Sequence, residues 1–297
     1  IIEGKTARSR KKPVMEIGVS SLPPLPVDLS DRNRTSPFAF TGNKFEFRAV
    51  GSSQSIAPVN IALNAAVACA LDDIATQLEA AVSAGTPLNQ ALQEFLPREF
   101  KEHSPVVFNG NGYSNTWPKE AERRGLPNLS NTVDALEHYS DPDVMNVFLR
   151  HGILSEREIL SRQEILLDTY AKDIEIEGAT LLDLVRGKVL PPCRAAQAQA
   201  CDLVLKTKKA GIEPDEEMKN LQTIRGHVTS MEKAVGQLEE AIAKVKGIEG
   251  TLERAKGARD QILPLMGKIR EDSDALEAIV DDKLWELPKY SELLWVH

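Results

Sequence analysis

Apolar and polar residues alternate on both sides of Gly42-Asn43, a pair typical of two-residue hairpin turns. With that turn, Phe38 pairs with Phe47 and Phe40 pairs with Phe45, which predicts a short antiparallel β-hairpin. Because successive side chains of a strand point to opposite faces, the four phenylalanines share one face. We expect this phenylalanine face to be buried against the helix that follows the hairpin.

The other face of the predicted hairpin is polar. Lys44, Glu46 and Arg48 follow one another along it, and the small Ala39 lies opposite the carboxylate. A solvent-exposed ladder of charges is one interpretation of this face. The other is a site for an anionic substrate and a metal, because carboxylates bind Mg²⁺ or Mn²⁺ and arginines hold carboxylates and phosphates through paired hydrogen bonds. The pattern alone leaves both open.

Beyond the hairpin, apolar positions recur three and four residues apart, which is the spacing of helices. Pro58 suits the first turn of a helix over residues 59–83, which we expect to be well buried, and Pro87 opens a second helix. The apolar run at 106–108 fits a short strand. Further helices are predicted at 117–124, 141–150, 155–189 and 193–209.

Two features shape the C-terminal half. Pro191-Pro192 is expected to break the helix that begins near residue 155. The apolar stripe at about 216–280 is interrupted near 246–250, so it predicts two antiparallel helices, the second kinked at Pro264. The predicted fold class is therefore α+β and mostly α: a β-hairpin followed by a large helical region with a long antiparallel helix pair. The aromatic tail after residue 284 is expected to dock on this body.

The composition and the net charge of the chain narrow the classes of function that it can have. The chain has 297 residues, of which 42% are hydrophobic and 27% charged, as in globular proteins, and its net charge of −8 argues against general nucleic-acid affinity. No apolar run reaches about 18 residues, so we expect no membrane span. The three cysteines fit a reducing, cytoplasmic environment. The five histidines lie singly, and no zinc site is predicted.

Several strings resemble one family. Asn33-Arg34-Thr35 followed by Phe45-Glu46-Phe47-Arg48 is similar to the late active-site strands of glutamine synthetases. The sequence of residues 31–53 resembles that of the type III members of the family. So do three further strings in the same order, which are Phe108-Asn-Gly-Asn-Gly-Tyr-Ser114, Arg124-Gly-Leu-Pro-Asn128 and Trp285-Glu-Leu-Pro-Lys-Tyr290. The resemblance runs from about Met15 to the C-terminus.

The resemblance assigns roles residue by residue. Arg34 matches an arginine that contacts the nucleotide phosphate and the substrate, and it is the expected catalytic residue. Glu46 matches a ligand of Mg²⁺ or Mn²⁺, and Arg48 matches the arginine that holds the carboxylate of glutamate. Lys44 lies where the family often has a basic residue near the nucleotide. The chain departs from the pattern at 37–39, where many relatives carry a further phosphate-binding arginine.

The resemblance implies an ATP-dependent ligase of nitrogen metabolism that joins ammonia to L-glutamate through γ-glutamyl phosphate. It implies a ring-type homo-oligomer and a chain that is the C-terminal part of a longer enzyme, and the negative net charge leads us to expect no nucleic-acid or membrane partner. Residues 1–100 would complete the catalytic domain, and residues 101–297 would form the helical type III C-terminal domain. The alternative is a non-catalytic helical assembly module that lacks the upstream active-site strands.

Overall fold

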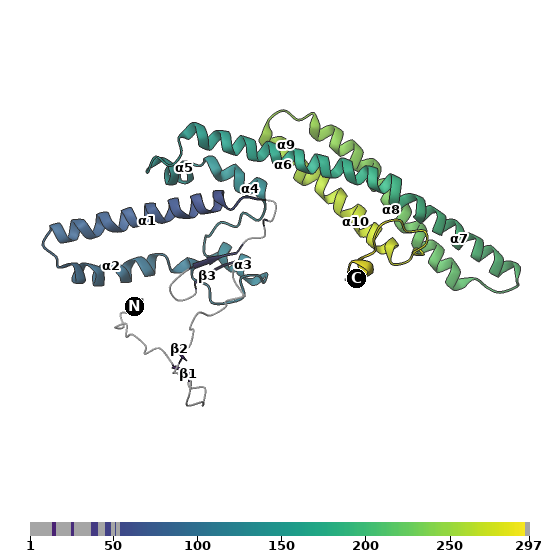
Figure 1. The fold of residues 1–297 in the computed structure, drawn as a ribbon, viewed down its shortest axis with the longest axis horizontal. Coiled ribbons are helices and arrows are strands. Elements are labelled where there is room, and N and C mark those ends of the chain that lie inside the picture. The colour runs from purple at the N-terminus through teal and green to yellow at the C-terminus, as the bar shows by residue number, and fades with distance from the viewer. Residues whose placement is uncertain are drawn as a thin grey trace. The chain divides into compact units, whose positions relative to one another are not determined.

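The computed structural model describes residues 14–15, 25–26, 37–40, 45–48, 51 and 54–294, and these are mostly helical, as predicted. Contacts divide the chain into two compact units (Figure 1). Unit 1 comprises residues 1–130 and 143–155, and unit 2 comprises residues 131–142 and 156–297. The domain boundary near residue 100 concerns the organisation of the family and stays a prediction.

The β-hairpin prediction is confirmed. Strands β3 (Phe38–Phe40) and β4 (Phe45–Phe47) pair antiparallel in the predicted register, with Ala39 opposite Glu46. The backbone N–H of Arg48 donates to the carbonyl of Pro37 at 2.7 Å and lengthens the pairing. The Gly42-Asn43 turn lies outside the described residues. A second antiparallel pair joins β1 (Val14–Met15) to β2 (Leu25–Pro26).

Helices α1 (Ala57–Ser83) and α2 (Leu88–Glu102) pack against each other in unit 1 (Figure 1). The prediction that the first of them is well buried is wrong. Ala65 is the buried residue of its 27, and Leu71 is 59% exposed. The physical reason is that apolar residues lie all around α1, so a neighbour on one side leaves the other sides uncovered.

Helix α1 is also the one described helix that is long and apolar enough to cross a membrane. The criterion is length and composition alone, and core helices and signal sequences meet it as well. Within unit 1, Asp72 and Asp73 of this helix pair with Arg150 at 2.5 and 2.7 Å, and the Cys69 thiol donates to the carbonyl of Val147. These polar contacts tie α1 to the residues around the end of α5 (Pro142–Leu149).

Short elements follow the α1–α2 pair. The prediction of a strand at 106–108 is wrong. A 3-10 helix ends at Val106, and the next two residues do not pair with another strand. The Arg124 guanidinium instead satisfies the carbonyls of Pro105 and Val107 at 2.9 and 2.8 Å, so this segment needs no strand partner. The elements in this part of the chain are η1 (Ser104–Val106), α3 (Thr116–Arg123), α4 (Thr132–Glu137), η2 (His138–Ser140) and α5 (Pro142–Leu149).

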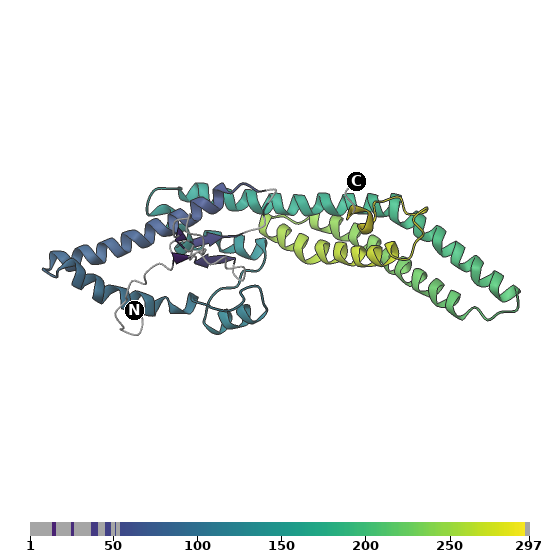
Figure 2. The ribbon, with the colours of Figure 1, turned by 60° about the horizontal axis from the view of Figure 1, so that its bottom comes forward.

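Unit 2 is a bundle of long helices with a continuous apolar core. The predicted antiparallel pair is present: α8 ends at Lys246, the chain turns, and α10 returns alongside α8 (Figures 1 and 2). Gly178 lets α6 approach α8 closely, because a Cβ at this position would lie 3.0 Å from Cδ1 of Ile242 in α8. The helices of unit 2 after residue 155 are α6 (Glu156–Leu184), α7 (Leu190–Lys209), α8 (Asp215–Lys246), α9 (Thr251–Gly257), α10 (Leu263–Glu277) and α11 (Tyr290–Leu293).

The prolines of unit 2 do not break its helices, which corrects the expectation for Pro191-Pro192. A π-helical segment, η3 (Val185–Val189), links α6 to α7, and Leu190 N–H donates to the carbonyl of Val185, five residues earlier. A proline lacks an N–H and crowds the preceding turn. The wider turn accommodates both effects without ending the helix. A second π-helical segment, η4 (Ala258–Ile262), precedes Pro264 in the same way.

The C-terminal tail docks on unit 2, as predicted. Trp285 is 7% exposed and belongs to the apolar core of the bundle. Tyr290 O–H and the Arg270 guanidinium lie 2.5 Å apart, and Tyr290 N–H donates to Glu277 at 2.8 Å. The tail is therefore held to α10 by both apolar and polar contacts.

Candidate functional site

Glu46 and Arg48 lie on the same face of the β3–β4 hairpin, as the alternation predicts. The Arg48 guanidinium donates to Glu46 Oε2 at 2.7 Å, and each side chain is about one third exposed at 34% and 35%. Ala39, opposite the carboxylate, is 1% exposed. The two residues that the resemblance assigns to metal and to substrate carboxylate thus lie within direct reach of each other.

This ion pair is weak enough to rearrange. A partly exposed acid–base pair contributes about 0–1 kcal/mol to stability, because water screens both charges. A ligand that binds more strongly than this ion pair can therefore replace either partner. A cation can bind the Glu46 carboxylate, and an anion can bind the Arg48 guanidinium. The geometry suits a site in which the two residues turn from each other to a metal and an anionic substrate.

Glu46 fits as one ligand of a divalent metal, not as a whole site. Magnesium bound with a nucleotide usually takes one or two carboxylates, and waters and phosphate oxygens complete its coordination. Over the parts of the chain that the structure describes, no group of three metal-ligating side chains gathers. The described residues therefore do not form a three-residue metal site around Glu46. Arg34 and Lys44 lie outside the described residues, so the structure does not place them.

The phenylalanine face of the hairpin is exposed, which corrects the expectation of a buried face. Phe38, Phe45 and Phe47 are 50%, 63% and 48% exposed. Phe38 stacks on Phe45 with ring centroids 5.1 Å apart and meets Phe47 edge-on at 6.1 Å. Within unit 1, no described element lies over these rings closely enough to bury them, and they cover one another instead.

The strings 108–114 and 124–128 form one packed cluster in unit 1. The Phe108 ring stacks on Trp117 at 4.4 Å, and the Arg124 guanidinium lies 5.5 Å from the centre of the Trp117 ring. A Cβ at Gly110 would lie 2.5 Å from the Phe108 ring, so a larger residue there would force this ring to shift. Hydrogen bonds from Arg123 and then Arg124 lower the pKa of the Glu120 carboxyl from 4.5 to about 2. The cluster holds the turn at 109–112 in place.

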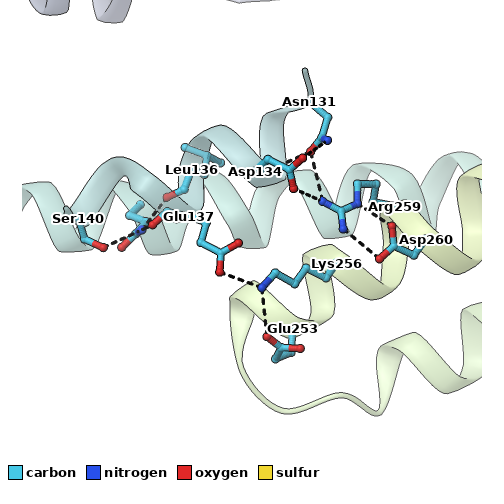
Figure 3. A network of polar contacts seen from close by, with 10 residues as sticks. Asn131, Asp134, Leu136, Glu137, Ser140, Glu253, Lys256, Arg259 and Asp260 are labelled. Atoms are coloured by element: carbon cyan, nitrogen blue, oxygen red, sulfur yellow. Dashed lines mark hydrogen bonds and ion pairs between the residues drawn. The ribbon is translucent and has the colours of Figure 1, made fainter. Parts of the chain in front are cut away.

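A polar network in unit 2 escaped the sequence analysis (Figure 3). Arg259 of η4 donates to Asp134 of α4 and to Asp260. These hydrogen bonds to the two carboxylates raise the pKa of Arg259, and the one to Asp260 raises it most. Lys256 pairs with Glu137 at 3.0 Å. Asp134 and Glu137 lie more than 100 positions from their partners Arg259 and Lys256 in sequence, so no local pattern predicts these two contacts. The network fastens α4 to the bundle.

Two buried acids of unit 2 were also missed. Glu175, 4% exposed, accepts two hydrogen bonds of 2.7 Å from the Arg254 guanidinium. Asp272, 2% exposed, lies 2.9 Å from His227 Nδ1 and 3.5 Å from Lys268 Nζ. Burial raises the pKa of Asp272, but hydrogen bonds from His227 and Ser230 and the charge of Lys268 lower it by more, so the net shift is downward. Both acids have a structural role between helices.

Comparison with known proteins supports the resemblance. Residues 91–208 match the family described as the glutamine synthetase C-terminal domain. The chain is 40% identical over 291 residues to a type-3 glutamine synthetase of Dictyostelium discoideum, covering 95% of this chain and 39% of that protein. It is 33% identical to a glutamine synthetase of Bacteroides fragilis (strain YCH46) over 96% of this chain and 40% of the relative. A third, of Butyrivibrio fibrisolvens, is 36% identical over 90% of this chain and 38% of the relative.

These matches relate the chain to the C-terminal region of the glutamine synthetases. One of the three relatives is a type-3 glutamine synthetase, and the resemblance stated from the sequence is confirmed. The chain spans about two fifths of the length of the curated relatives it matches. The activity of a whole glutamine synthetase is therefore a proposal for this chain.

Proposed function

We propose that this chain is the C-terminal part of a type III glutamine synthetase, which joins ammonia to L-glutamate with ATP through γ-glutamyl phosphate. The observation that carries the proposal is the 40% identity to a type-3 glutamine synthetase along 95% of the chain. The Glu46–Arg48 pair at the end of β4 supports it, because a carboxylate and a guanidinium side by side suit a metal and an anionic amino acid.

Each site residue has a distinct task under this proposal. Glu46 holds a Mg²⁺ or Mn²⁺, which supplies positive charge to the transferring phosphoryl group. Arg48 binds the carboxylate of glutamate through two parallel hydrogen bonds and so fixes its orientation. Arg34 neutralises charge on the phosphoryl group, and Lys44 lies near the nucleotide. Phosphoryl transfer depends mainly on such positioning and charge neutralisation.

The exposed apolar surface of unit 1 agrees with a larger enzyme. The rings of Phe38, Phe45 and Phe47 and the side chain of Leu71 all keep about half or more of their surface in solvent. A full-length subunit would supply further catalytic strands to cover such surface. We further propose a cytoplasmic, ring-type homo-oligomer with glutamate, ammonia and ATP as substrates.

The rival proposal is a non-catalytic helical assembly module. It draws on the same facts, because the chain contains about two fifths of its relatives and the described residues offer one metal-binding carboxylate at the hairpin. Glutamine formation from glutamate, ammonia and ATP, measured with this polypeptide alone and with full-length subunits added, separates the two. Activity that depends on Glu46 supports the ligase. Tight association with full-length subunits, together with activity that ignores Glu46, supports the module.

A further inference from the structure

Among the described helices, α7 and α8 alone form one end of unit 2, where the chain turns between them (Figures 1 and 2). They run antiparallel there. Arg194 pairs with Glu232 at 2.7 Å near the body of the bundle, and Thr207 O–H donates to Glu217 at 3.3 Å near the turn. Leu205 of α7 is 61% exposed, so no described element buries it.

One side of this helix pair forms a groove with a volume of about 520 Å³. In each helix, the lining residues lie three, four or seven positions apart, so they share one face of that helix. Leu205 extends the α7 face toward the turn, four positions after Cys201, and Asp215 extends the α8 face, three positions before Met218. We call the groove together with Leu205 and Asp215 the tip face. The lining of the groove includes Arg194 and Cys201 of α7 and Met218, Leu221, Gln222 and Arg225 of α8.

The α8 part of the tip face carries an unpaired charge at each end. Asp215 and Arg225 make no ion pair or side-chain hydrogen bond with any residue that the structure describes. They are ten positions apart, which is about 15 Å along the helix, and Met218, 38% exposed, lies between them with Leu221. The helix dipole favours an acid in the first turn, but its effect does not reach Arg225. Both charges are therefore available to a partner.

The positions of these residues make the tip face complementary to itself. When two copies of α8 lie antiparallel about a two-fold axis at position 220, each residue faces the residue of the second copy that is equally far from the axis. Asp215 and Arg225 are both five positions from this axis, so the acid of each copy faces the arginine of the other. Met218 faces Gln222 in the same way, and the Leu221 side chains of the two copies meet near the axis. Two ion pairs thus flank an apolar centre.

We propose that the tip face of unit 2 is a two-fold contact between two copies of this chain. Asp215 of each copy pairs with Arg225 of the other, and Met218 and Leu221 of both copies form the apolar centre. Leu205 lies beside this centre and loses solvent exposure when the copies meet. A two-fold contact joins two copies through the same surface, whereas a ring needs head-to-tail contacts. The proposal therefore adds an interaction surface to the helical unit and depends neither on the proposed ligase activity nor on the proposed ring.

Sedimentation velocity of the whole chain tests whether the contact forms. We expect a reversible monomer–dimer equilibrium between about 1 and about 200 μM, because a small contact with exposed ion pairs gives a modest affinity. The dissociation constant should rise as salt is added, because salt screens exposed charges. A chain that remains monomeric at about 200 μM would overturn the proposal.

Two charge reversals locate the contact. Asp215→Arg and Arg225→Glu each bring two pairs of like charges face to face, so each variant should dimerise at least about tenfold more weakly. Lys244→Glu is the matched control, because it reverses a charge in the same helix about 36 Å from the proposed axis, and it should leave the dissociation constant unchanged. Dimerisation of both tip variants as tight as that of the unsubstituted chain would contradict the contact.

Mixing the two variants tests the two-fold arrangement itself. In an equimolar mixture of Asp215→Arg and Arg225→Glu, opposite charges face each other again at both ends of the contact. The mixed dimer should form with a dissociation constant within about threefold of that of the unsubstituted chain. This recovery would also exclude misfolding as the cause of the weaker dimerisation of each variant. A mixture that associates as weakly as the separate variants would overturn the proposal.

Discussion

Two long helices, α1 of unit 1 and α8 of unit 2, show how differently the two units are built. Helix α1 buries one of its 27 residues, whereas α8 buries nine of its 32. Both carry many apolar side chains. In α8 they form one stripe that faces α6, α7 and α10, and in α1 they are spread around the helix. Unit 2 completes its own core, whereas unit 1 presents apolar surface that other chain segments or subunits would bury.

The polar groups follow the same division. In unit 2, the buried acids Glu175 and Asp272 each meet a basic side chain from another helix. In unit 1, the Glu46–Arg48 pair joins residues two positions apart at the end of β4 and stays partly in solvent. Charges that hold helices together are thus fixed in unit 2, while the charges assigned to substrates remain accessible.

The largest expected effect on stability comes from a leucine-to-alanine substitution, which can be made once in each unit. Leu238→Ala in α8 should lower the free energy of unfolding by about 3–5 kcal/mol, because this side chain is 0% exposed and its loss leaves a cavity. Leu71→Ala in α1 should lower it by less than about 1 kcal/mol, because Leu71 is 59% exposed. Urea unfolding measures both. Equal losses would contradict the comparison, and a larger loss for Leu71→Ala in a full-length subunit would sharpen it.

Arg254→Ala should come next, at about 2–4 kcal/mol, because it leaves the buried Glu175 carboxylate without its partner. The range is set below that of a fully buried pair, because the Arg254 side chain is 23% exposed. Arg194→Ala, which removes an exposed partner of Glu232, is the control and should cost about 1 kcal/mol or less. Thermal unfolding followed by circular dichroism compares the two. A loss for Arg254→Ala no larger than that for Arg194→Ala would show that Arg254 does not stabilise the buried Glu175 carboxylate.

Asp272 gives unit 2 an expected dependence on acid. Its folded-state pKa lies below the ordinary value of 3.8, so the ionised form is stabilised by folding. This contribution is fully present above the unfolded pKa and is lost as the pH falls through the folded pKa. Asp272→Asn should therefore flatten the decline of stability from about pH 5 to about pH 3, and Asp202→Asn at an exposed pair should not. If stability declines with pH as steeply in Asp272→Asn as in the unsubstituted chain, the lowered pKa of Asp272 in the folded chain is contradicted.

The smallest effect is local to unit 1. The Glu120 carboxyl should titrate with a pKa of about 2 in an NMR experiment on the folded chain. Replacing Arg123, which provides the strongest hydrogen bond, with Gln should move that pKa back toward 4.5. Because Glu120 lies at the surface, the unfolding midpoint should stay nearly constant. An unshifted pKa in the unsubstituted chain would show that the cluster around Trp117 is looser than described.

Local signals in the sequence predicted local structure well. The alternation around Gly42-Asn43 predicted the β3–β4 register, and the interruption near 246–250 predicted where the chain turns between α8 and α9. Burial was harder, because a pattern shows which residues are apolar but not whether something covers them. This is why the expectations for the phenylalanine face and for α1 failed.

Long-range and subtle backbone features were beyond the sequence. Asp134 and Arg259 are 125 positions apart, and nothing in either neighbourhood indicates the other. The π-helical segments before Pro191 and Pro264 were also missed, because a proline was expected to break or kink a helix rather than follow a wider turn. Of the site, the strand positions of Glu46 and Arg48 followed from alternation, whereas their roles came from the resemblance.

The most direct test of the proposed ligase is Glu46→Gln in the full-length protein, with glutamine formation measured across a range of Mg²⁺ concentrations. Gln keeps the size of the side chain but removes the negative charge that a hard metal prefers. The account predicts that half-maximal activity needs about 10–100-fold more Mg²⁺ and that turnover falls at limiting metal. Unchanged activity at low Mg²⁺ would contradict the role of Glu46 and favour the assembly module.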